Sequence, residues 1–498
     1  MRFPDLAIFP FLAVLALSVA GKPEASDEHT FTGCLLRLSN PSYPIFSAIY
    51  FPSNSSYSSV LQSYIRNLRF NESNTPKPQL ILTALHESHI QTAIVCAKYH
   101  GLQMRIRSGG HDFEGSSYVS DVPFFILDMF NLRSINVSIE DETAWVEVGA
   151  TVGEVYYRIA EKSNIHGFPT GTCPTVGVGG HFSGGGYGIM ARKYGLSIDN
   201  IVDARLVDLV HVPPTVAIFT VERTCAQNLT DIVYSLLQIV DKLDGEIFIK
   251  TAINVANDSH RVGKKTIQAT FLGYFLGNST GLLSSINERF PELGLRKSDC
   301  TEHTWIESIV RWNNFPVGTS VKILLSRIHP NLQHLKRKSD YLKKPIPKQG
   351  LESIFKKMIE LETPMLKLFP YGGFMSEILP SEKPFPHRAG NIVKVEYATN
   401  WDENGIEAAN HYINLTRNLY NFMAPFVSKS RGAYLNYRDF DLGINHNGQN
   451  SYIEGAAYGI KYFEDNFNRL VQIKTRVDPE NFFRNEQSIP IFPSIGSQ

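Results

Sequence analysis

The sequence predicts an α+β protein in two parts, because the pattern of apolar residues changes close to residue 213. From residue 79 to about residue 210, apolar strands alternate with helices and with glycine-rich loops. After Pro213 and Pro214, several segments alternate apolar and polar residues or run apolar throughout, and helical segments separate them. The second part therefore has the pattern of an antiparallel sheet covered by helices.

The first twenty residues indicate a secretory signal peptide. Arg2 precedes an apolar run from Leu6 to Leu17, and the residues 18–20 (SVA) have the small-residue spacing of a signal peptidase site. The run is too short to cross a bilayer, and no later stretch is long and apolar enough to form a transmembrane helix. We expect a secreted chain from which residues 1–20 have been removed and which has no membrane span.

The first part begins with a strand–helix–strand unit. The run from Gln79 to Leu85 has the pattern of a buried strand. Ser88 can cap the following helix, whose apolar residues keep helical spacing, and Gly101 can end it. A second strand, Leu102 to Ile106, leads into the glycine loop "RSGGHDFEG" at 107–115.

Two more strands and a helix lie before a second glycine loop. The segments 124–128 and 144–148 have strand patterns, and 151–162 is helical with four apolar residues on one face. The loop "GTCPTVGVGGHFSGGGYG" follows at 171–188.

The second part consists of strand patterns separated by helices. The predicted strands include "TVAIFTVERT" (215–224), "GEIFIKTAIN" (245–254), "KTIQATFLGYF" (265–275) and "NIVKVEYAT" (391–399), and the predicted helices include 350–361 and 404–423. Toward the end of the chain, residues 460–474 place four apolar side chains on one helical stripe, which Asp478 and Pro479 end.

Charge and glycosylation signals narrow the possible partners. The chain has 48 Lys+Arg and 48 Asp+Glu, so no net field draws it to nucleic acid or to an anionic membrane. It also has N-x-S/T acceptors, which in a secreted protein imply exposed loops that carry N-glycans. These acceptors are Asn54, Asn71, Asn136, Asn228, Asn257, Asn278 and Asn414.

The cysteine count is odd, so in an oxidising compartment at least one thiol is unpaired or otherwise occupied. The cysteines are Cys34, Cys96, Cys173, Cys225 and Cys300. Spacing does not determine which of them pair. We expect a Cys34–Cys96 disulfide, because Cys34 flanks the start of the fold and Cys96 lies on the first helix.

The two glycine loops suggest a dinucleotide cofactor, because glycines let the backbone approach a pyrophosphate and point its N–H groups inward. Neither loop has the G-x-G-x-x-G spacing of a Rossmann fold, so the sequence lacks the motif expected of an NAD dehydrogenase. The sequence also excludes a P-loop. Each loop carries one nucleophile, His111 and Cys173. These two with Asp112 and His181 could also hold a metal, but no C-x-x-C or H-x-x-x-H spacing supports this, and we expect no metal.

Six motifs in order resemble the plant berberine-bridge-enzyme-like (reticuline-oxidase-like) proteins. These proteins are secreted oxidoreductases with an FAD domain of the vanillyl-alcohol-oxidase (PCMH) type, and the resemblance covers about residues 30–492. The motifs are the two glycine loops, "YGLSIDNIVDARLVD", "PYGGFMSEI", "YLNYRDFDLG" and "VDPENFFRNEQSIP".

The resemblance implies a division into domains and a location. It makes 30–212 an FAD-binding domain, 213–440 a substrate-binding domain and 441–498 a C-terminal segment that returns to the FAD domain. It also implies a place in the cell wall or apoplast, or in the vacuole.

The resemblance further implies that FAD is attached at two points, through His111 to the 8α-methyl carbon and through Cys173 to C6 of the flavin. Two links fix the orientation of the ring and favour hydride acceptance. The other residues that we expect to bind the cofactor are Arg107, Ser108, Gly109, Gly110, Gly171, Val176, Gly177, Gly180 and Val202.

The implied reaction is an oxidation of an alcohol or amine in a plant small molecule or carbohydrate. A hydride goes to the flavin while a base removes a proton, and oxygen then takes the electrons to give hydrogen peroxide. Glu396 matches the family's base, and strand alternation places Lys394 on the same face; the alternative is a solvated, charged strand face. Tyr187, Tyr434 and Tyr437 match tyrosines of the family's active site.

Three positions refine this expectation. The pKa of Tyr187 could fall if Lys394 stood close, which would make Tyr187 a second candidate base. Phe113 replaces a tyrosine found in relatives that oxidise aromatic allylic alcohols. Val176 stands where relatives have an oxygen gate, and valine there resembles the oxygen-reactive members.

The chain also departs from the family pattern near residues 208–212. Asp208 to His211 lead directly to Val212, where relatives have a hairpin and a glycine-rich run. Two functions from different classes therefore remain open: a bicovalent FAD oxidase, and a flavin-poor, inactive variant that only binds a ligand.

Overall fold

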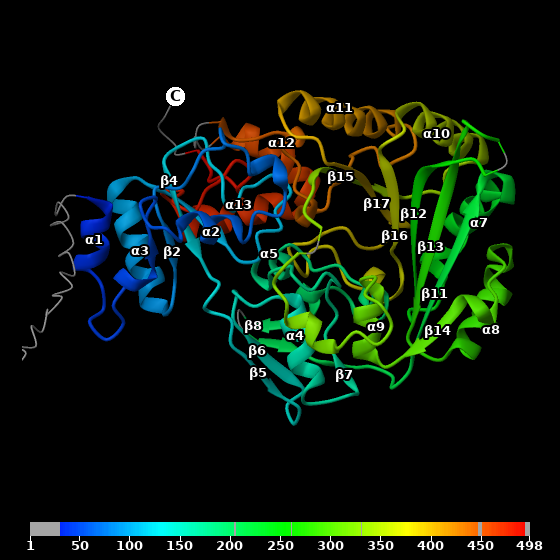
Figure 1. Ribbon diagram of the computed structural model, residues 1–498, viewed down its shortest axis with the longest axis horizontal. Helices are drawn as coiled ribbons and strands as arrows, with labels where there is room; N and C mark the ends of the chain where they lie inside the picture. The colour runs from blue at the N-terminus through cyan, green and yellow to red at the C-terminus, as the bar shows by residue number, and fades with distance from the viewer. Residues whose placement is uncertain (1–29, 204–205, 260, 330, 447–450, 494–498) are drawn as a thin grey trace, which may run out of the picture.

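The computed structural model describes residues 30–203, 206–259, 261–329, 331–446 and 451–493. Their helices and strands confirm the α+β class (Figure 1). The predicted signal peptide, residues 1–20, lies outside these ranges. Within them, no helix combines the length and the apolar character that a membrane crossing requires.

The N-terminal elements form a small sheet against which two helices pack. Its strand order is β1-β2-β4-β3, and β2 and β3 both run parallel to β4. Cys34 and Cys96 join the two helices through a disulfide, which confirms the expected pairing. The elements are α1 (Phe31–Arg37), β1 (Ile49–Tyr50), α2 (Tyr57–Gln62), β2 (Ile81–Thr83), α3 (Glu87–His100), β3 (Gln103–Arg107) and β4 (Phe124–Asp128).

The start of α3 corrects one prediction. Ser88 does not cap this helix, because the Nδ1 atom of His86 accepts a hydrogen bond from the backbone N–H of Ser88 at 3.1 Å. His86 is therefore the N-cap, and Ser88 already belongs to the helix. Gly101 ends the helix as predicted, with a φ of 64°.

The second glycine loop lies between a second small sheet and a two-stranded ladder. The sheet has the order β5-β6-β9-β8, and the ladder pairs β7 with β10. Thr151 caps α4, so the helix begins where the sequence predicts it. The elements are β5 (Ile135–Ser138), β6 (Thr143–Val146), α4 (Val152–Ala160), β7 (His166–Gly167), α5 (Val178–Ser183), α6 (Ala191–Tyr194), β8 (Ile201–Asp203), β9 (Leu206–Asp208) and β10 (Val210–His211).

The second part is built on a seven-stranded antiparallel sheet with the order β14-β11-β13-β12-β16-β17-β15. Four helices cover one face of this sheet (Figure 1), and their apolar residues form one core with it. The strands are β11 (Val216–Thr224), β12 (Ile247–Asn257), β13 (Lys265–Phe275), β14 (Cys300–His303), β15 (His334–Leu342), β16 (Met365–Pro370) and β17 (Val393–Trp401). The covering helices are α7 (Leu229–Ile239), α8 (Ser279–Arg289), α10 (Lys348–Leu361) and α11 (Ile406–Phe422).

The opposite face of the sheet turns toward the first part. There, α9 (Trp305–Trp312) and residues of the second glycine-loop region pack against apolar side chains of β11, β12 and β13. This arrangement leaves the polar residues of the neighbouring strands β15, β16 and β17 facing the glycine loops.

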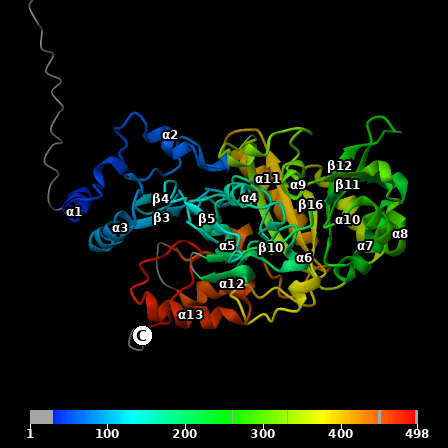
Figure 2. The ribbon, with the colours of Figure 1, turned by 90° about the horizontal axis from the view of Figure 1, so that it is seen from below.

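The C-terminal segment packs against the N-terminal sheet. Its two helices, α12 (Tyr452–Phe463) and α13 (Asn466–Val477), lie side by side (Figure 2). The helical stripe predicted over 460–474 is therefore interrupted: the chain turns at Glu464, whose φ is 44°. Beyond α13, Glu486 forms an ion pair with the buried Arg105 of β3.

A buried ion-pair cluster connects all three regions. The Lys336 and Lys338 side chains of β15 both contact Asp439, at 2.8 Å and 2.5 Å, and Lys338 also contacts Asp441 at 2.9 Å. Glu114, which belongs to the first glycine loop, pairs with Lys336. Burial alone would lower the pKa of Lys336, but the surrounding carboxylates raise it above its ordinary value.

Candidate active site

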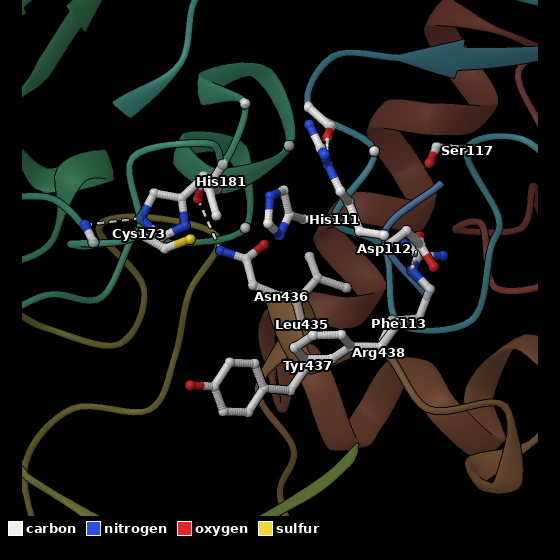
Figure 3. Close-up of a pocket in the computed structure, with 18 of the residues that line it drawn as sticks. His111, Asp112, Phe113, Ser117, Cys173, His181, Leu435, Asn436, Tyr437 and Arg438 are labelled. Carbon is white, nitrogen blue, oxygen red and sulfur yellow. Dashed lines mark hydrogen bonds and ion pairs between the residues drawn. The ribbon is translucent and has the colours of Figure 1, made fainter. Parts of the chain in front are cut away.

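A cavity of about 1020 Å³ lies where the two glycine loops meet the uncovered face of the seven-stranded sheet. Its lining comes from the loop after β3, the loop before α5, strands β12, β15, β16 and β17, and the segment 434–438. Figure 3 shows His111, Cys173 and His181 on one side of this cavity, with the segment from Leu435 to Arg438 facing them. Residues far apart in the sequence therefore share one chamber.

The glycine loops contact each other backbone to backbone. A Cβ atom on Gly109 would lie 2.2 Å from the nitrogen of Gly177, and one on Gly177 would lie 2.2 Å from the nitrogen of Gly109. Gly110 needs its φ of 68°, and a Cβ there would meet the Tyr64 carbonyl oxygen at 1.9 Å. A Cβ on Gly180, in contrast, would meet nothing within 4 Å, so this glycine leaves space open to the cavity.

Most of the residues predicted to bind the cofactor line this cavity. They are Ser108, Gly109, Gly110, His111, Gly171, Cys173, Val176, Gly177 and Gly180. The Ser108 hydroxyl donates to the Val148 carbonyl at 2.6 Å, which fixes the first loop, and the Gly171 N–H donates to His181 Nε2 at 3.0 Å, which fixes the second.

Two predicted residues lie elsewhere. Arg107 is fully buried beneath the first loop, where its guanidinium pairs with Asp128 at 2.6 Å and donates to the carbonyls of Val60 and Leu61. Val202 lies in β8, an edge strand, with 61% of its surface exposed. Arg107 therefore supports the loop from below, and Val202 does not reach the cavity.

One hydroxyl connects the two predicted attachment residues. The Oγ1 atom of Thr175 lies 2.9 Å from His111 Nε2 and 3.7 Å from Cys173 Sγ. Thr175 itself is buried, so its hydroxyl is held in place between the two side chains. The histidine and the cysteine thus converge on one point although 62 residues of sequence separate them.

The surroundings of both nucleophiles keep them uncharged. Burial, together with Arg66, His329 and His181, lowers the pKa of His111 well below its ordinary value. Burial likewise raises the pKa of the Cys173 thiol, although Thr175 and Arg66 oppose this effect. Near neutral pH, His111 is therefore a neutral imidazole and Cys173 a thiol.

The four residues considered for a metal do not share one coordination point. His181 uses Nε2 to accept the hydrogen bond from Gly171, and Asp112 accepts hydrogen bonds from the backbone N–H groups of Glu114 and Ser116. Burial and Lys394 lower the pKa of His181 to about 4, which keeps it a neutral acceptor. Its role in this structure is to hold the second glycine loop.

The sheet supplies the other wall of the cavity. Lys394 and Glu396 of β17 face the cavity, while Val393, Val395 and Tyr397 pack into the helix-covered core. The predicted alternation is confirmed, and the alternative of a solvated strand face is wrong, because Lys394 is only 1% and Glu396 only 4% exposed.

Glu396 lies between two cations. Lys367 Nζ approaches its Oε1 atom to 2.9 Å, and Arg337 Nε approaches the same atom to 3.2 Å. Burial alone would raise the pKa of Glu396, but Lys367 and Arg337 outweigh burial and lower it to about 2. Glu396 is therefore a carboxylate with little tendency to take a proton.

Lys394 sits among aromatic rings. Its Nζ atom lies 4.2 Å from the ring centroid of Tyr187, 4.1 Å from that of Tyr434 and 4.3 Å from that of Tyr437. Burial lowers the pKa of Lys394 to about 7, against the opposing effect of Glu396. The amine can therefore be neutral or charged close to physiological pH.

The proximity of Lys394 does not lower the pKa of Tyr187. Burial raises the pKa of Tyr187 well above its ordinary value, and the nearby Tyr371 raises it further. Lys394 approaches the face of the ring, whereas the hydroxyl donates a hydrogen bond to the Pro370 carbonyl. The prediction that Tyr187 becomes more acidic is therefore wrong.

Several residues of the site were not predicted from the sequence. Lys367 is the one charged residue of the otherwise apolar strand β16, "MLKLFP", and this isolation is a signal that could have marked it. Thr175 and Asn436 have no such signal. Asn436 Nδ2 donates to the His181 carbonyl at 2.8 Å and so ties the C-terminal wall to the second loop.

Comparisons with known proteins agree with this arrangement. A family model described as an FAD binding domain matches residues 78–209, and one described as berberine and berberine like matches residues 433–490. Berberine bridge enzyme-like 8 of Arabidopsis thaliana is 53% identical over 510 positions, covering 94% of this chain and 96% of that protein. Berberine bridge enzyme-like 14 of the same plant is 47% identical, with 97% of each chain covered.

Solved structures show the same fold. BBE-like #28 from Arabidopsis thaliana superposes with a TM-score of 0.85 at 38% identity, covering 93% of this chain and 99% of that one. The grass pollen allergen Phl p 4, described as having glucose dehydrogenase activity, gives a TM-score of 0.86 at 35% identity, covering 93% and 100%. With the two glycine loops, the shared cavity and the identity over nearly the whole length, these matches place the chain in the berberine bridge enzyme-like family of FAD-linked oxidoreductases.

Proposed function

We propose that this protein is a secreted FAD-dependent oxidase that takes a hydride from an alcohol or amine of a plant small molecule or carbohydrate. Oxygen is the proposed electron acceptor and hydrogen peroxide the product. The observation that carries the proposal is the single cavity that holds His111 and Cys173 at one end and Lys394 and Glu396 at the other.

The residues present fit the cofactor. The two glycine loops leave backbone rather than side chains along the cavity, and the open space beside Gly180 suits a large ligand. His111 and Cys173 would attach FAD covalently at two points, and Ser108, Gly109 and Gly177 would line its binding site. When bound, FAD supplies the two-electron acceptor that the side chains of the cavity lack.

Thr175 can join the Cys173 thiol to the His111 imidazole by hydrogen bonds. The Cys173 thiol can donate to Thr175 Oγ1, whose own hydroxyl can donate to His111 Nε2. Because the pKa of His111 is low, its neutral imidazole is an acceptor at physiological pH. This chain of contacts supports both residues as attachment points on the same ligand.

Lys394 is better matched than Glu396 to the role of base. A base works best when the pKa of its conjugate acid lies near the working pH. The value of about 7 for Lys394 meets this condition, and the value of about 2 for Glu396 does not. We therefore assign proton removal to neutral Lys394, with Tyr187 and Tyr437 beside it. We assign a positioning role to Glu396, whose carboxylate orients the charged side chains next to it.

The charges of the cavity favour a polar or anionic substrate. Lys250, Lys367 and Arg337 lie on the sheet wall, and Glu396 is the one carboxylate of that wall in the described chain. Burial and the neighbouring Lys367 lower the pKa of Lys250 to about 8, so an anionic substrate group would keep it charged. A sugar or sugar acid fits this lining, and the glucose dehydrogenase activity of Phl p 4 supports the carbohydrate class.

The proposals of secretion and N-glycosylation are supported by the sequence and by the surface positions of the N-x-S/T acceptors. All seven acceptors have exposed side chains, at Asn54, Asn71, Asn136, Asn228, Asn257, Asn278 and Asn414. The Cys34–Cys96 disulfide is typical of an oxidising compartment. The proposed location is the cell wall or apoplast, or the vacuole.

Mass spectrometry can test the proposed covalent linkage of FAD to His111 and Cys173. We expect the purified wild-type protein to be yellow and to retain flavin after denaturation, with His111 and Cys173 both modified in peptide maps. His111→Ala and Cys173→Ala should each retain flavin through one link with lower turnover, and the double variant should release it. A colourless, folded wild-type protein with both side chains unmodified would instead support the flavin-poor, ligand-binding alternative.

The pH profile tests the assignment of Lys394. Since only the neutral amine accepts a proton, kcat/KM should rise with pH through about 7 and level off above it. The measurement is peroxide release with a fixed alcohol or sugar from pH 5 to pH 9. A profile that is already flat at pH 5 would fit a group with a pKa near 2 and would transfer the role to Glu396.

A further inference from the structure

Glu142, His166 and His211 converge at the point where the chain passes from the FAD-binding region to the second part. His166 in β7 and His211 in β10 are direct cross-strand partners, and Glu142 lies in the turn between β5 and β6. His211 Nε2 lies 2.8 Å and His166 Nε2 lies 3.6 Å from Glu142 Oε1. One ligand atom from each of the three residues falls within 4.8 Å of the others.

The buried histidine provides an independent sign of a ligand. His166 is 4% exposed, and its Nε2 atom has no hydrogen-bond partner among the described residues although it points at this cluster. Its other nitrogen, Nδ1, lies 2.7 Å from Ser163 Oγ. A hydroxyl that holds one ring nitrogen leaves the other free to bind, as is usual for histidines that coordinate metals.

The donor set matches a transition metal. Two imidazole nitrogens and one carboxylate oxygen are ligands of Zn²⁺, which takes tetrahedral sites with bonds of about 2.0–2.2 Å. Tetrahedral ligands then lie about 3.3–3.5 Å apart, so the two measured separations need to change by only about half an ångström. The side chain of Glu142 is about half exposed and that of His211 mostly exposed, which gives an ion access from solvent and leaves a fourth position for water.

We propose that Glu142, His166 and His211 form a binding site for a divalent transition-metal cation, best matched by Zn²⁺. None of the three lines the active-site cavity, so the ion would act as a structural link. It would join the β5–β6 turn to the β7–β10 ladder just before Val212, where the chain enters the second part. This site is independent of the proposed oxidase activity.

The test is zinc binding by full-length protein made without a histidine tag and stripped with a chelator. After equilibrium dialysis against ZnCl₂, wild-type protein should hold about one Zn²⁺ per chain. His211→Ala removes a mostly exposed side chain, and His166→Ala the buried one. Each should weaken binding by at least about 100-fold, more than the 10–100-fold expected when only a supporting residue such as Ser163 is lost.

A matched control is available on another surface. His446 and Glu454 form a histidine–glutamate pair at 2.7 Å, with no third ligand among the described residues. His446→Ala should therefore bind Zn²⁺ as the wild type does, and Zn²⁺ should raise the melting temperature of both proteins but not that of His211→Ala. No uptake by the wild type, or equal uptake by wild type and His211→Ala, would overturn the proposal.

Discussion

Replacing Lys394 with methionine should lower kcat/KM by about two to four orders of magnitude, the range expected when a positioned base is lost. Methionine keeps the length and apolar stem of the side chain, so the ring contacts of Tyr187, Tyr434 and Tyr437 with that stem survive. Cofactor content and the folded state should stay unchanged, because aromatic rings, which also pack against an apolar side chain, surround the amine. The measurement is the rate of flavin bleaching under substrate in stopped flow.

Glu396→Gln is the variant that separates a base from a positioning residue. Glu396 raises the pKa of Lys394, so its loss should move the rise of the pH profile to lower pH while leaving a substantial maximal rate. The carboxylate also holds Lys367 and Arg337, so unfolding of this variant must be checked in parallel. Loss of turnover at every pH in a folded, flavin-containing variant would show that Glu396, and not Lys394, removes the proton.

Lys336→Met should reduce the free energy of unfolding by about 3–5 kcal/mol, because it leaves buried carboxylates without a partner. Glu114 and Asp439 are 3% and 2% exposed at the side chain, and both face Lys336. Lys336 and Asp439 belong to the second part of the chain and Glu114 to the first, so the loss should also loosen these two parts from each other. Chemical denaturation, followed by tryptophan fluorescence, measures the change.

A surface ion pair provides the comparison for this variant. Lys348 contacts Asp231 at 2.6 Å, but both side chains are more than half exposed, so Lys348→Met should lower the free energy of unfolding far less than Lys336→Met does. Equal effects of the two substitutions would mean that the buried cluster adds no more than a surface pair.

The same cluster sets a pH window for stability. Burial alone would raise the pKa of Asp441, but Arg417, Lys336 and Lys338 lower it well below its ordinary value, so its contribution is complete above about pH 4 and is lost as pH falls further. The pKa of Lys336 is raised, so its contribution is complete below about pH 10 and is lost above that. The difference between wild type and Lys336→Met should therefore be largest between these limits.

Local patterns were sufficient to predict the strands β2, β3, β4, β11, β12, β13 and β17, but not β15 and β16. The alternation in "NIVKVEYAT" placed Lys394 and Glu396 together, and the run "FFILD" matched β4 over its whole length. The contact between the two glycine loops was not predicted, but it accounts for some of their glycines, since the two backbones approach as closely as only glycine allows. The family resemblance added the roles of His111 and Cys173, which their types alone did not specify.

Features that depend on tertiary contacts were not predictable in this way. His86, and not Ser88, caps α3 because its ring accepts a hydrogen bond from the backbone N–H of Ser88. The turn at Glu464 contains no glycine or proline that would have predicted it. Glu396 gained its low pKa from Lys367 and Arg337, which other strands supply. The three residues of the proposed metal site span 142–211 and meet only through strand pairing, so no short motif marks them.

The wall formed by residues 434–438 has a consequence for how the protein is made. Tyr434, Asn436 and Tyr437 close the chamber that residues 107–188 begin, and the ribosome adds them more than two hundred residues later. During synthesis the glycine loops therefore emerge with one side of the chamber open. Tight capture of the prosthetic group must wait until translation has passed these residues, which makes loading a late event in the maturation of the chain.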